Sequence, residues 1–317
     1  MACHNGREAL VRRLLGANAN VHISNNFGQS PLWVAASKSD VIVQLLLSAG
    51  ANIHQSALNE WTPLYHAAAG GREAIVKRLL EVGANVDQST NLRETPLYAA
   101  SVRKFESVVQ RLLLANASVN LCQHEGETPL YAASEYGCDA VVQHLLKARA
   151  DVNLANRLGK SPLFIASEYG HDVVVRRLLA AGACVNQVDT LGRAPLWIAA
   201  QKGRDLVLHL LVAKKAMLDH GDNDGQTPLS IAAEKGHLDV VAFLIGEGAN
   251  IDAAMTDAAT PLFLAKKNGH AKVVAFIIEA KKRPRTTITN NYTTNGVVFN
   301  GNHATNHGPV TQHRKAP

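Results

Sequence analysis

The sequence contains few of the features by which enzymes and membrane proteins are recognised. It has no G-x-G-x-x-G, no G-x-x-x-x-G-K-[ST], no H-E-x-x-H and no G-x-S-x-G, so the common nucleotide, zinc-protease and serine-hydrolase motifs are missing. It also has no run of about 18 apolar residues, the length that a membrane-spanning helix requires. We therefore predict that the protein is not an enzyme, and we expect no cofactor, no metal site, no small-molecule substrate and no membrane contact.

Cysteine is also scarce. The four cysteines are Cys3, Cys122, Cys138 and Cys184, and no two of them form a C-x-x-C pair. Residues 1–25 are too polar for a secretory signal peptide. Both observations predict reduced thiols in an intracellular protein, so the cytoplasm is the expected compartment.

Acidic residues are absent from residues 281–317. This segment contains six of the 32 basic residues and none of the 26 acidic ones, so the other 26 basic residues balance the acidic ones. The net charge of +6 therefore belongs to the C-terminal segment. A neutral surface suits a phosphate backbone poorly, so nucleic acid is not an expected partner of residues 1–280. Nucleic-acid binding through the C-terminal segment is kept as a third interpretation of the function.

The sequence does contain one stretch that is repeated along most of the chain. Its clearest example is residues 126–153, GETPLYAASEYGCDAVVQHLLKARADVN. Thr128 and Pro129 predict the start of a short helix, and Gly137 predicts its end. The apolar residues between Ala140 and Leu146 recur at the spacing of a second, amphipathic helix. Neither helix is long enough to be stable alone, so the unit must pack against copies of itself.

The copies are marked by a Pro-Leu dipeptide, which recurs at Pro31, Pro63, Pro96, Pro129, Pro162, Pro195, Pro228 and Pro261. The first spacing is 32 residues and the other six are 33. A 33-residue period with T-P-L-x-x-A resembles the ankyrin-repeat family over about residues 1–280. The resemblance implies an all-α fold, an α-solenoid of helix-turn-helix units with β-hairpin tips.

We predict a repeat domain over residues 1–283. It begins with a half-repeat, 1–24, and continues with repeats 25–56, 57–89, 90–122, 123–155, 156–188, 189–221, 222–254 and 255–283. The half-repeat lacks the T-P-L helix, which predicts a fragment of a longer protein and leaves Leu10, Val11, Leu14 and Leu15 without an upstream neighbour.

Residues 284–317 differ in composition from the repeats. They are rich in Asn, Thr, Gly and His and contain few apolar residues, so we predict a disordered polar basic tail. Val297–Phe299, flanked by Asn-Gly, is a candidate short β segment within it.

The residue after T-P-L departs from the His that is usual in the family. It is aromatic in seven of eight repeats: Trp33, Tyr65, Tyr98, Tyr131, Phe164, Trp197 and Phe263, with Ser230 as the exception. We predict a ladder of rings that fills the seams between repeats. A stacking surface for a ligand is the alternative.

Other departures concern the turns. Lys104 stands where a Gly normally ends the first helix, and Asn116, Arg149 and Lys215 stand where a Gly ends the second. If the left-handed backbone is kept, each Lys or Arg should cost about 1 kcal/mol. The first complete repeat is one residue short after Lys38, which predicts a tighter turn between its helices.

The resemblance implies a partner surface made of the tips just before T-P-L and the last turn of each first helix. Carried onto this chain, the candidate partner-binding residues are Phe27, Leu58, Trp61, Leu92, Glu125, Glu127, Tyr136, Arg157, Lys160, Tyr169, Arg193 and Lys202. The apolar residues among them occupy positions that the fold exposes, and Trp61 is expected to have no core to fill. The charged residues predict a surface that is acidic and then basic along the stack.

We therefore predict a non-catalytic protein–protein interaction scaffold that binds a partner protein on the concave face of the stack. The alternative is the recognition fragment of a larger signalling protein or enzyme whose effector domain lies upstream of Met1.

Three further sites are hypotheses. Asn153 resembles an asparagine that an oxygen-sensing dioxygenase hydroxylates in some ankyrin proteins; the alternative is a hairpin Asn that bonds the backbone. Lys282, Arg283 and Arg285 fit a nuclear import signal, which makes the nucleus the alternative compartment, or they complete the last helix. His171, His237 and His270 occupy the G-H position of the family, where they are expected to start helices rather than bind metal.

Overall fold

The computed structural model describes residues 2–282, 292–294 and 297–299. Arg283, Arg285 and most of the predicted disordered tail, namely residues 283–291, 295–296 and 300–317, lie outside the described residues. Within them, the chain forms seventeen helices and two short strands. The predicted all-α solenoid is confirmed.

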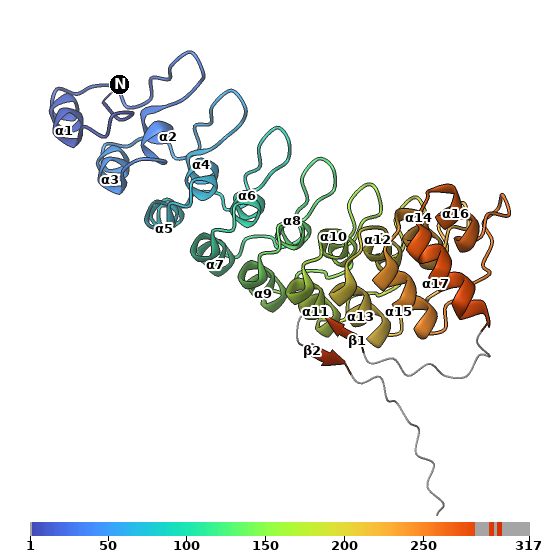
Figure 1. Cartoon of the computed structure of the whole chain (residues 1–317). Coiled ribbons are helices and arrows are strands. Elements are labelled where there is room, and N and C mark those ends of the chain that lie inside the picture. Colours follow the sequence, from blue (N-terminus) through green and yellow to red (C-terminus); the bar gives the residue numbers. More distant parts are fainter. Residues whose placement is uncertain (1, 283–291, 295–296, 300–317) are drawn as a thin grey trace, which may run out of the picture.

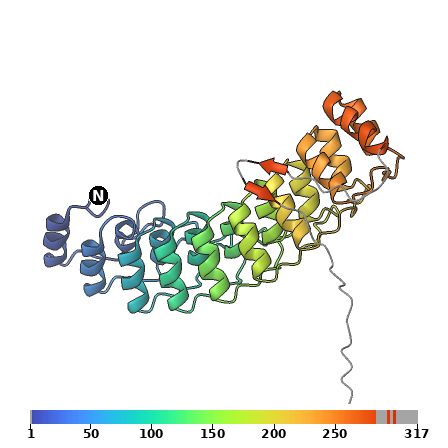
Figure 2. The same ribbon diagram turned by 60° about the horizontal axis from the view of Figure 1, so that its bottom comes forward.

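The helices form two layers along one row (Figure 1). The first helices of the eight complete repeats are α2 (Pro31–Ala35), α4 (Pro63–Ala69), α6 (Pro96–Val102), α8 (Pro129–Glu135), α10 (Pro162–Tyr169), α12 (Pro195–Gln201), α14 (Pro228–Lys235) and α16 (Pro261–Lys267). The other layer contains α1 (Glu8–Gly16), α3 (Asp40–Ser48), α5 (Glu73–Glu81), α7 (Glu106–Leu114), α9 (Asp139–Lys147), α11 (Asp172–Ala180), α13 (Asp205–Ala213), α15 (Leu238–Gly246) and α17 (Ala271–Lys282). The row is long and curved (Figure 2).

The first helices begin in the same way because their sequences begin in the same way. At α8 the Thr128 hydroxyl accepts a hydrogen bond from the Tyr131 N–H at 3.1 Å, and Pro129 occupies the first helical position. Ser or Thr makes this bond in every first helix except α12, where Ala194 has no hydroxyl. The proline at the first helical position, with a capping hydroxyl in seven of the eight helices, therefore sets where each first helix starts.

The second helices are amphipathic. In α9, Val141, Val142 and Leu145 are fully buried, while the first position carries Asp139, which suits the positive end of the helix dipole. The same pattern in each repeat joins into one continuous core that runs from Val11 to Ile277.

The glycines that end the first helices are required by the next repeat. A side-chain carbon at Gly137 would lie 2.6 Å from Nδ1 of His171, which packs there from the following repeat. Lys104 adopts the predicted left-handed backbone with φ of 62°, and the residue 34 positions after it is the small Cys138. The absence of a large neighbour explains why this position accepts a side chain.

The turns after the second helices have no such neighbour. A side-chain carbon at Gly182 would meet no atom within 4 Å. Asn116, Arg149 and Lys215 keep the left-handed backbone at the equivalent positions, with φ between 60° and 63°. The predicted cost of about 1 kcal/mol for Arg or Lys is therefore a backbone cost only.

The first complete repeat has the predicted tighter turn. Its first helix, α2, has only five residues. The Ser39 hydroxyl then accepts a hydrogen bond from the Ile42 N–H at 3.3 Å and caps α3, whereas α5, α7 and α9 have no side-chain cap.

The exposed edge predicted for α1 is only partly present. Leu10 and Leu14 are exposed, but Val11 is buried and Leu15 packs against the core. The prediction was wrong for these two residues because one side of α1 packs on α3.

Two strands follow the repeats. β1 (Tyr292–Thr294) pairs antiparallel with β2 (Val297–Phe299), with Tyr292 opposite Phe299. The candidate β segment at Val297–Phe299 is thus confirmed. No helix in the described part of the chain is both long and apolar enough to cross a membrane.

Candidate partner-binding face

The tips before each Pro-Leu dipeptide form one continuous edge, along the upper side of Figure 1. Each tip is a turn closed by two backbone hydrogen bonds, for example from the Asn156 N–H to the Lys160 carbonyl at 3.0 Å and from the Gly159 N–H to the Asn156 carbonyl at 2.9 Å. Neighbouring tips are also bonded, as from the Arg157 N–H to the Glu125 carbonyl at 2.9 Å. Within the described residues the tips contain no β-strand, so the implied β-hairpins are present as short hydrogen-bonded turns.

Side chains at the tip bases hold these turns in place. The Asn156 Oδ1 accepts hydrogen bonds from the N–H groups of Leu158 and Lys160, both at 3.0 Å. Asp189 does the same for Leu191 and Arg193. The tips are therefore rigid turns rather than free loops.

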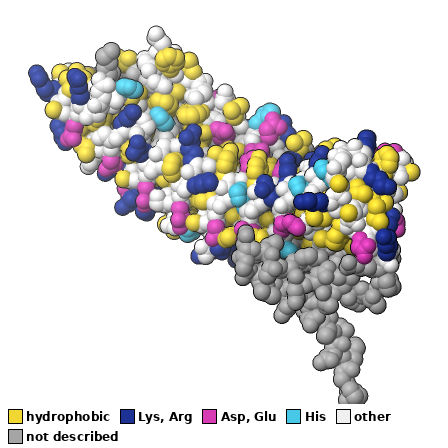
Figure 3. All heavy atoms as spheres, viewed as in Figure 1, with side chains coloured by type: hydrophobic (Ala, Val, Ile, Leu, Met, Phe, Trp, Pro, Cys, Tyr) yellow, Lys and Arg dark blue, Asp and Glu magenta, His cyan; other side chains and the backbone are white. Residues whose placement is uncertain are grey.

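Apolar side chains stand on several tips. Phe27, Leu58 and Leu92 are each more than half exposed, as the sequence predicted. Leu158 and Leu191 are equally exposed; the sequence places them on tips, at the position of Leu92 four residues before the proline, but they are not among the twelve candidates named above. That shared position was the signal that could have identified them. In Figure 3, hydrophobic side chains reach the surface along the edge that carries the N-terminal tips.

Trp61 differs from the other apolar tip residues. Its ring lies 4.8 Å from the Tyr65 ring and 6.2 Å from the His66 ring, and the residue is only partly exposed. The expectation that it has no core to fill was wrong, because the edge of the aromatic ladder reaches it.

The predicted aromatic ladder is confirmed. The rings at Trp33, Tyr65, Tyr98, Tyr131, Phe164 and Trp197 are all buried in the seams. Phe263 is half exposed, because α16 is the last first helix in the described residues. A buried ladder offers no open stacking surface for a ligand.

Four rings of the ladder, at Tyr65, Tyr98, Phe164 and Trp197, contact the residue two positions before the next proline. The Tyr98 hydroxyl donates to Glu127 Oε2 at 2.8 Å, and the Tyr65 hydroxyl donates to Glu94. Burial and the adjacent carboxylates raise the pKa of Tyr65 and Tyr98, so both hydroxyls stay protonated.

The match changes in later repeats, where cations replace carboxylates. The Phe164 ring has Lys160 Nζ 5.4 Å and the Arg193 guanidinium carbon 5.8 Å from its centroid. The same guanidinium lies 5.5 Å from the Trp197 ring. These contacts are cation–π interactions. The two earlier tyrosine rings thus lie beside carboxylates, whereas these later rings, Phe and Trp, lie beside cations.

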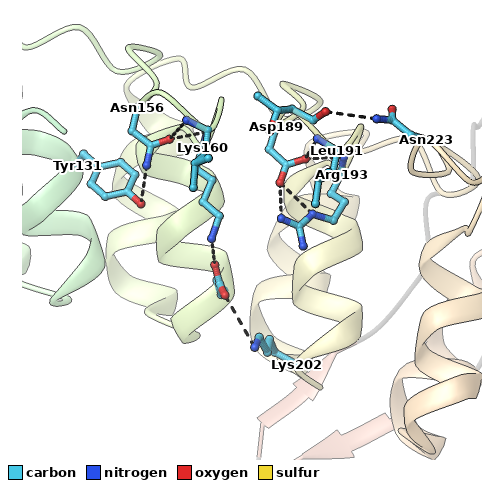
Figure 4. A network of polar contacts seen from close by, with 11 residues as sticks. Tyr131, Asn156, Lys160, Asp189, Leu191, Arg193, Lys202 and Asn223 are labelled. Atoms are coloured by element: carbon cyan, nitrogen blue, oxygen red, sulfur yellow. Dashed lines mark hydrogen bonds and ion pairs between the residues drawn. The ribbon is translucent and has the colours of Figure 1, made fainter. Parts of the chain in front are cut away.

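The cations of this second part are already paired (Figure 4). Lys160 Nζ lies 2.9 Å from Glu168 Oε2, and Lys202 Nζ lies 3.8 Å from Glu168 Oε1. Arg193 binds the buried Asp189 carboxylate through Nε at 2.8 Å and Nη2 at 2.5 Å. The basic part of the face is therefore largely neutralised by its own acids.

The acidic part is not neutralised in this way. Glu94, Glu125, Glu127 and Glu135 form no ion pair with Lys or Arg in the described part of the chain. Glu125 meets only His124, at 3.0 Å. Burial, with the nearby Glu127, raises the pKa of Glu135, although Lys160 opposes the rise.

Two tyrosines stand beside these acids. Tyr136 and Tyr169 follow or end α8 and α10 and are nearly half exposed. Burial, followed by the charges of Glu135 and Glu168, raises the pKa of Tyr169. Arg157 and Lys202 are exposed farther along. The tips and the last turns of the first helices, with these residues, are called the palm face below.

The histidines of the G-H position stand at the start of their helices, as expected, and their rings also bind the preceding repeat. The Nε2 atoms of His171, His237 and His270 bind the carbonyls of Glu135, Gln201 and Glu234 in the preceding repeat, at 2.8 to 3.0 Å. His171 and His237 precede their helices without capping them through the side chain. Within the described residues, no group of His, Cys, Asp and Glu has the arrangement of a metal site.

The possible hydroxylation site at Asn153 and the possible nuclear import signal that includes Lys282 stay predictions. Asn153 Oδ1 accepts a hydrogen bond from the Cys184 N–H at 2.7 Å, and its carbonyl accepts one from Gln187 at 3.0 Å. Lys282 ends α17 and lies 3.9 Å from Glu279.

Comparison with known proteins gives one match. A family profile described as ankyrin repeats (3 copies) matches residues 1–90, 86–156, 140–219, 163–255 and 196–290. No curated protein matches the chain. The overlapping matches extend without a gap from residue 1 to residue 290.

Proposed function

Because the chain belongs to the ankyrin-repeat family, whose repeats form a protein–protein interaction module, we propose that it is a non-catalytic scaffold that binds a partner protein on the concave side of the stack. The observation that supports this most directly is the row of exposed apolar tips at Phe27, Leu58, Leu92, Leu158 and Leu191. We place the protein in the cytoplasm.

The row has the properties of a binding surface. Burying one Leu or Phe side chain contributes about 1.5–3 kcal/mol, so a few tips can supply most of the affinity. Because the tips are held by backbone bonds to one another, little conformational entropy is lost when they are covered.

The test compares a double Leu→Ser variant of the tips with a single Leu→Ser control away from the tips. Leu92→Ser together with Leu158→Ser removes two tips, whereas Leu114→Ser removes an equally apolar and exposed side chain at the end of α7. Each full-length variant is used to capture proteins from a cell extract, and the captured proteins are identified by mass spectrometry.

We expect a partner that the wild type and Leu114→Ser capture and that the tip variant loses by about tenfold or more. Equal capture by all three proteins would contradict binding through the tips.

A further inference from the structure

The hairpin that follows the repeats is too small to be stable by itself. β1 and β2 have three residues each, and in the described part of the chain they pair only with each other. An isolated two-stranded hairpin is at best marginally stable in water, and it gains stability from further strands or from a helix packed against it. The hairpin therefore requires an additional partner element.

The described repeats do not supply that element. They contain no strand that β1 or β2 could join, and no described helix packs along either strand. Figure 1 places the two strands on the side of the second helices, away from the tips of the palm face. Each strand thus has an outer edge whose N–H and C=O groups are paired with no described strand, and such an edge is a template for another chain.

The sequence around the hairpin lacks the features that protect an edge strand. Natural edges are usually blocked by charged side chains or by proline. Residues 286–313 contain no Asp, Glu, Lys or Arg, although 18% of the whole chain is charged, and no proline lies between Pro284 and Pro309. Neither charge nor a missing N–H donor therefore opposes the pairing of this stretch with another strand.

The composition of the same stretch favours pairing with copies of itself. It is rich in Thr and Asn and also contains Ile288, Tyr292, Val297, Val298 and Phe299. β-branched and aromatic residues favour strands, and identical segments stacked in register add asparagine ladders and stacked rings to the backbone hydrogen bonds. A strand of another protein would offer the backbone bonds alone, so a second copy of the chain is the better occupant.

We propose that β1 and β2 pair with the same strands of other copies of this chain, so that the protein assembles through a shared β-sheet. Each added hairpin pairs at one edge and leaves a new edge open, so the assembly grows beyond a dimer. The tips take no part in this contact, and the inference is therefore independent of the proposed function.

The charges that flank the hairpin determine how assembly responds to salt. All six basic residues of segment 281–317 lie outside residues 286–313, in 281–285 and 314–315, and those of neighbouring copies repel one another. Residues 1–280 have no net charge that could offset this repulsion. Salt screens it, since the Debye length falls from about 10 Å at about 0.1 M to about 3 Å at about 1 M. Assembly should therefore increase with salt.

The test uses the purified full-length chain without a partner. Sedimentation velocity at increasing protein concentration, at about 0.1 M and about 1 M salt, measures assembly, and infrared spectroscopy of the sedimented protein detects intermolecular β-sheet. We expect assemblies that grow with protein concentration and with salt and that contain this β-sheet. A chain that stays monomeric under all these conditions would overturn the proposal.

The decisive variant is Val298→Lys, which places a charge in the middle of β2. Thr311→Lys adds the same charge to the same segment beyond Pro309 and is the matched control. Because stacked copies bring like charges together, Val298→Lys should reduce the assembled fraction by about tenfold or more, whereas Thr311→Lys should assemble like the wild type. Assembly that Val298→Lys retains would overturn the proposal. Thermal melting should show the same stability of the repeats in all three proteins.

The tip variant separates this inference from the proposed function. Leu92→Ser with Leu158→Ser should assemble like the wild type, and Val298→Lys should still capture the partner that the tips bind. Assembly that is lost in the tip variant and retained in Val298→Lys would show that the repeats associate through their tips. That result would overturn the shared β-sheet and leave partner binding through the tips to be decided by the capture experiment.

Discussion

Single side chains in this protein depend on their counterpart one repeat away. His66 is an example, because its ring lies 3.7 Å from that of Trp33 and its Nδ1 donates to the Trp33 carbonyl at 3.1 Å. Burial lowers the pKa of His66, and the charge of Lys38 adds to this, although the hydrogen bond to Trp33 opposes it. The imidazole is therefore held neutral against the core.

The lowered pKa gives a testable pH dependence. The unfolded chain protonates His66 at its ordinary pKa of about 6.5, whereas the folded chain does so only at lower pH, so stability is lost as pH falls below about 6.5. His66→Phe keeps a packed ring but cannot titrate. We expect the melting temperature of the wild type to fall more than that of His66→Phe between pH 7 and pH 5. Parallel curves would show that His66 is not the group responsible.

At the scale of the elements, the residue that ends a first helix packs against the residue that precedes the second helix of the next repeat. Gly137 makes room for His171, and Gly170 makes room for Arg204, whose Cδ would lie 2.8 Å from an added carbon. Within the described residues, the Lys104–Cys138 seam alone combines a side chain at the turn with a small residue opposite.

This match predicts strong coupling between two substitutions. Cys138→His alone should destabilise the fold, because the ring would meet the side chain of Lys104. Lys104→Gly alone should change stability by about 1 kcal/mol at most, since it exchanges backbone strain for chain entropy. In the Lys104→Gly background, Cys138→His should become stabilising, with a coupling energy of about 1 kcal/mol or more in urea unfolding. If the two substitutions change the free energy of unfolding additively, residues 104 and 138 do not depend on each other and the prediction is wrong.

Along the whole molecule, two kinds of side-chain contact join neighbouring repeats. Ion pairs join the second helices of the N-terminal repeats: Asp40–Arg78 at 2.7 Å, Glu73–Arg111 at 2.8 Å and Asp139–Arg177 at 2.5 Å, and a hydrogen bond joins Glu106 to His144 Nε2 at 3.0 Å. The equivalent partner of Asp205 is Phe243, and burial, together with Asp239, raises the pKa of Asp205. Side-chain bonds to carbonyls are also made by His66 in the N-terminal part, and they link every repeat from His171 to His270.

The division predicts a different response to salt in the two halves. Half-exposed ion pairs contribute up to about 1 kcal/mol each and are screened by salt, whereas bonds to carbonyls are not. Hydrogen exchange at low salt and at about 1 M salt should therefore accelerate more in α3, α5 and α7 than in α13 and α15. A uniform response along the row would contradict this division.

The sequence alone determined the repeat, the helices and the buried ladder, because caps, helix-ending residues and apolar spacing act within a few residues of one another. It also identified exposed tips such as Phe27 and Leu92, since their place in the repeat implies exposure. Only the tertiary structure decided which charges are already satisfied. Lys160 and Arg193 are paired, Glu135 has no ion pair with Lys or Arg in the described residues, and Trp61 lies against the ladder. The contacts that match one seam to the next join residues about 29 to 38 positions apart, so they exist only when the repeats are stacked.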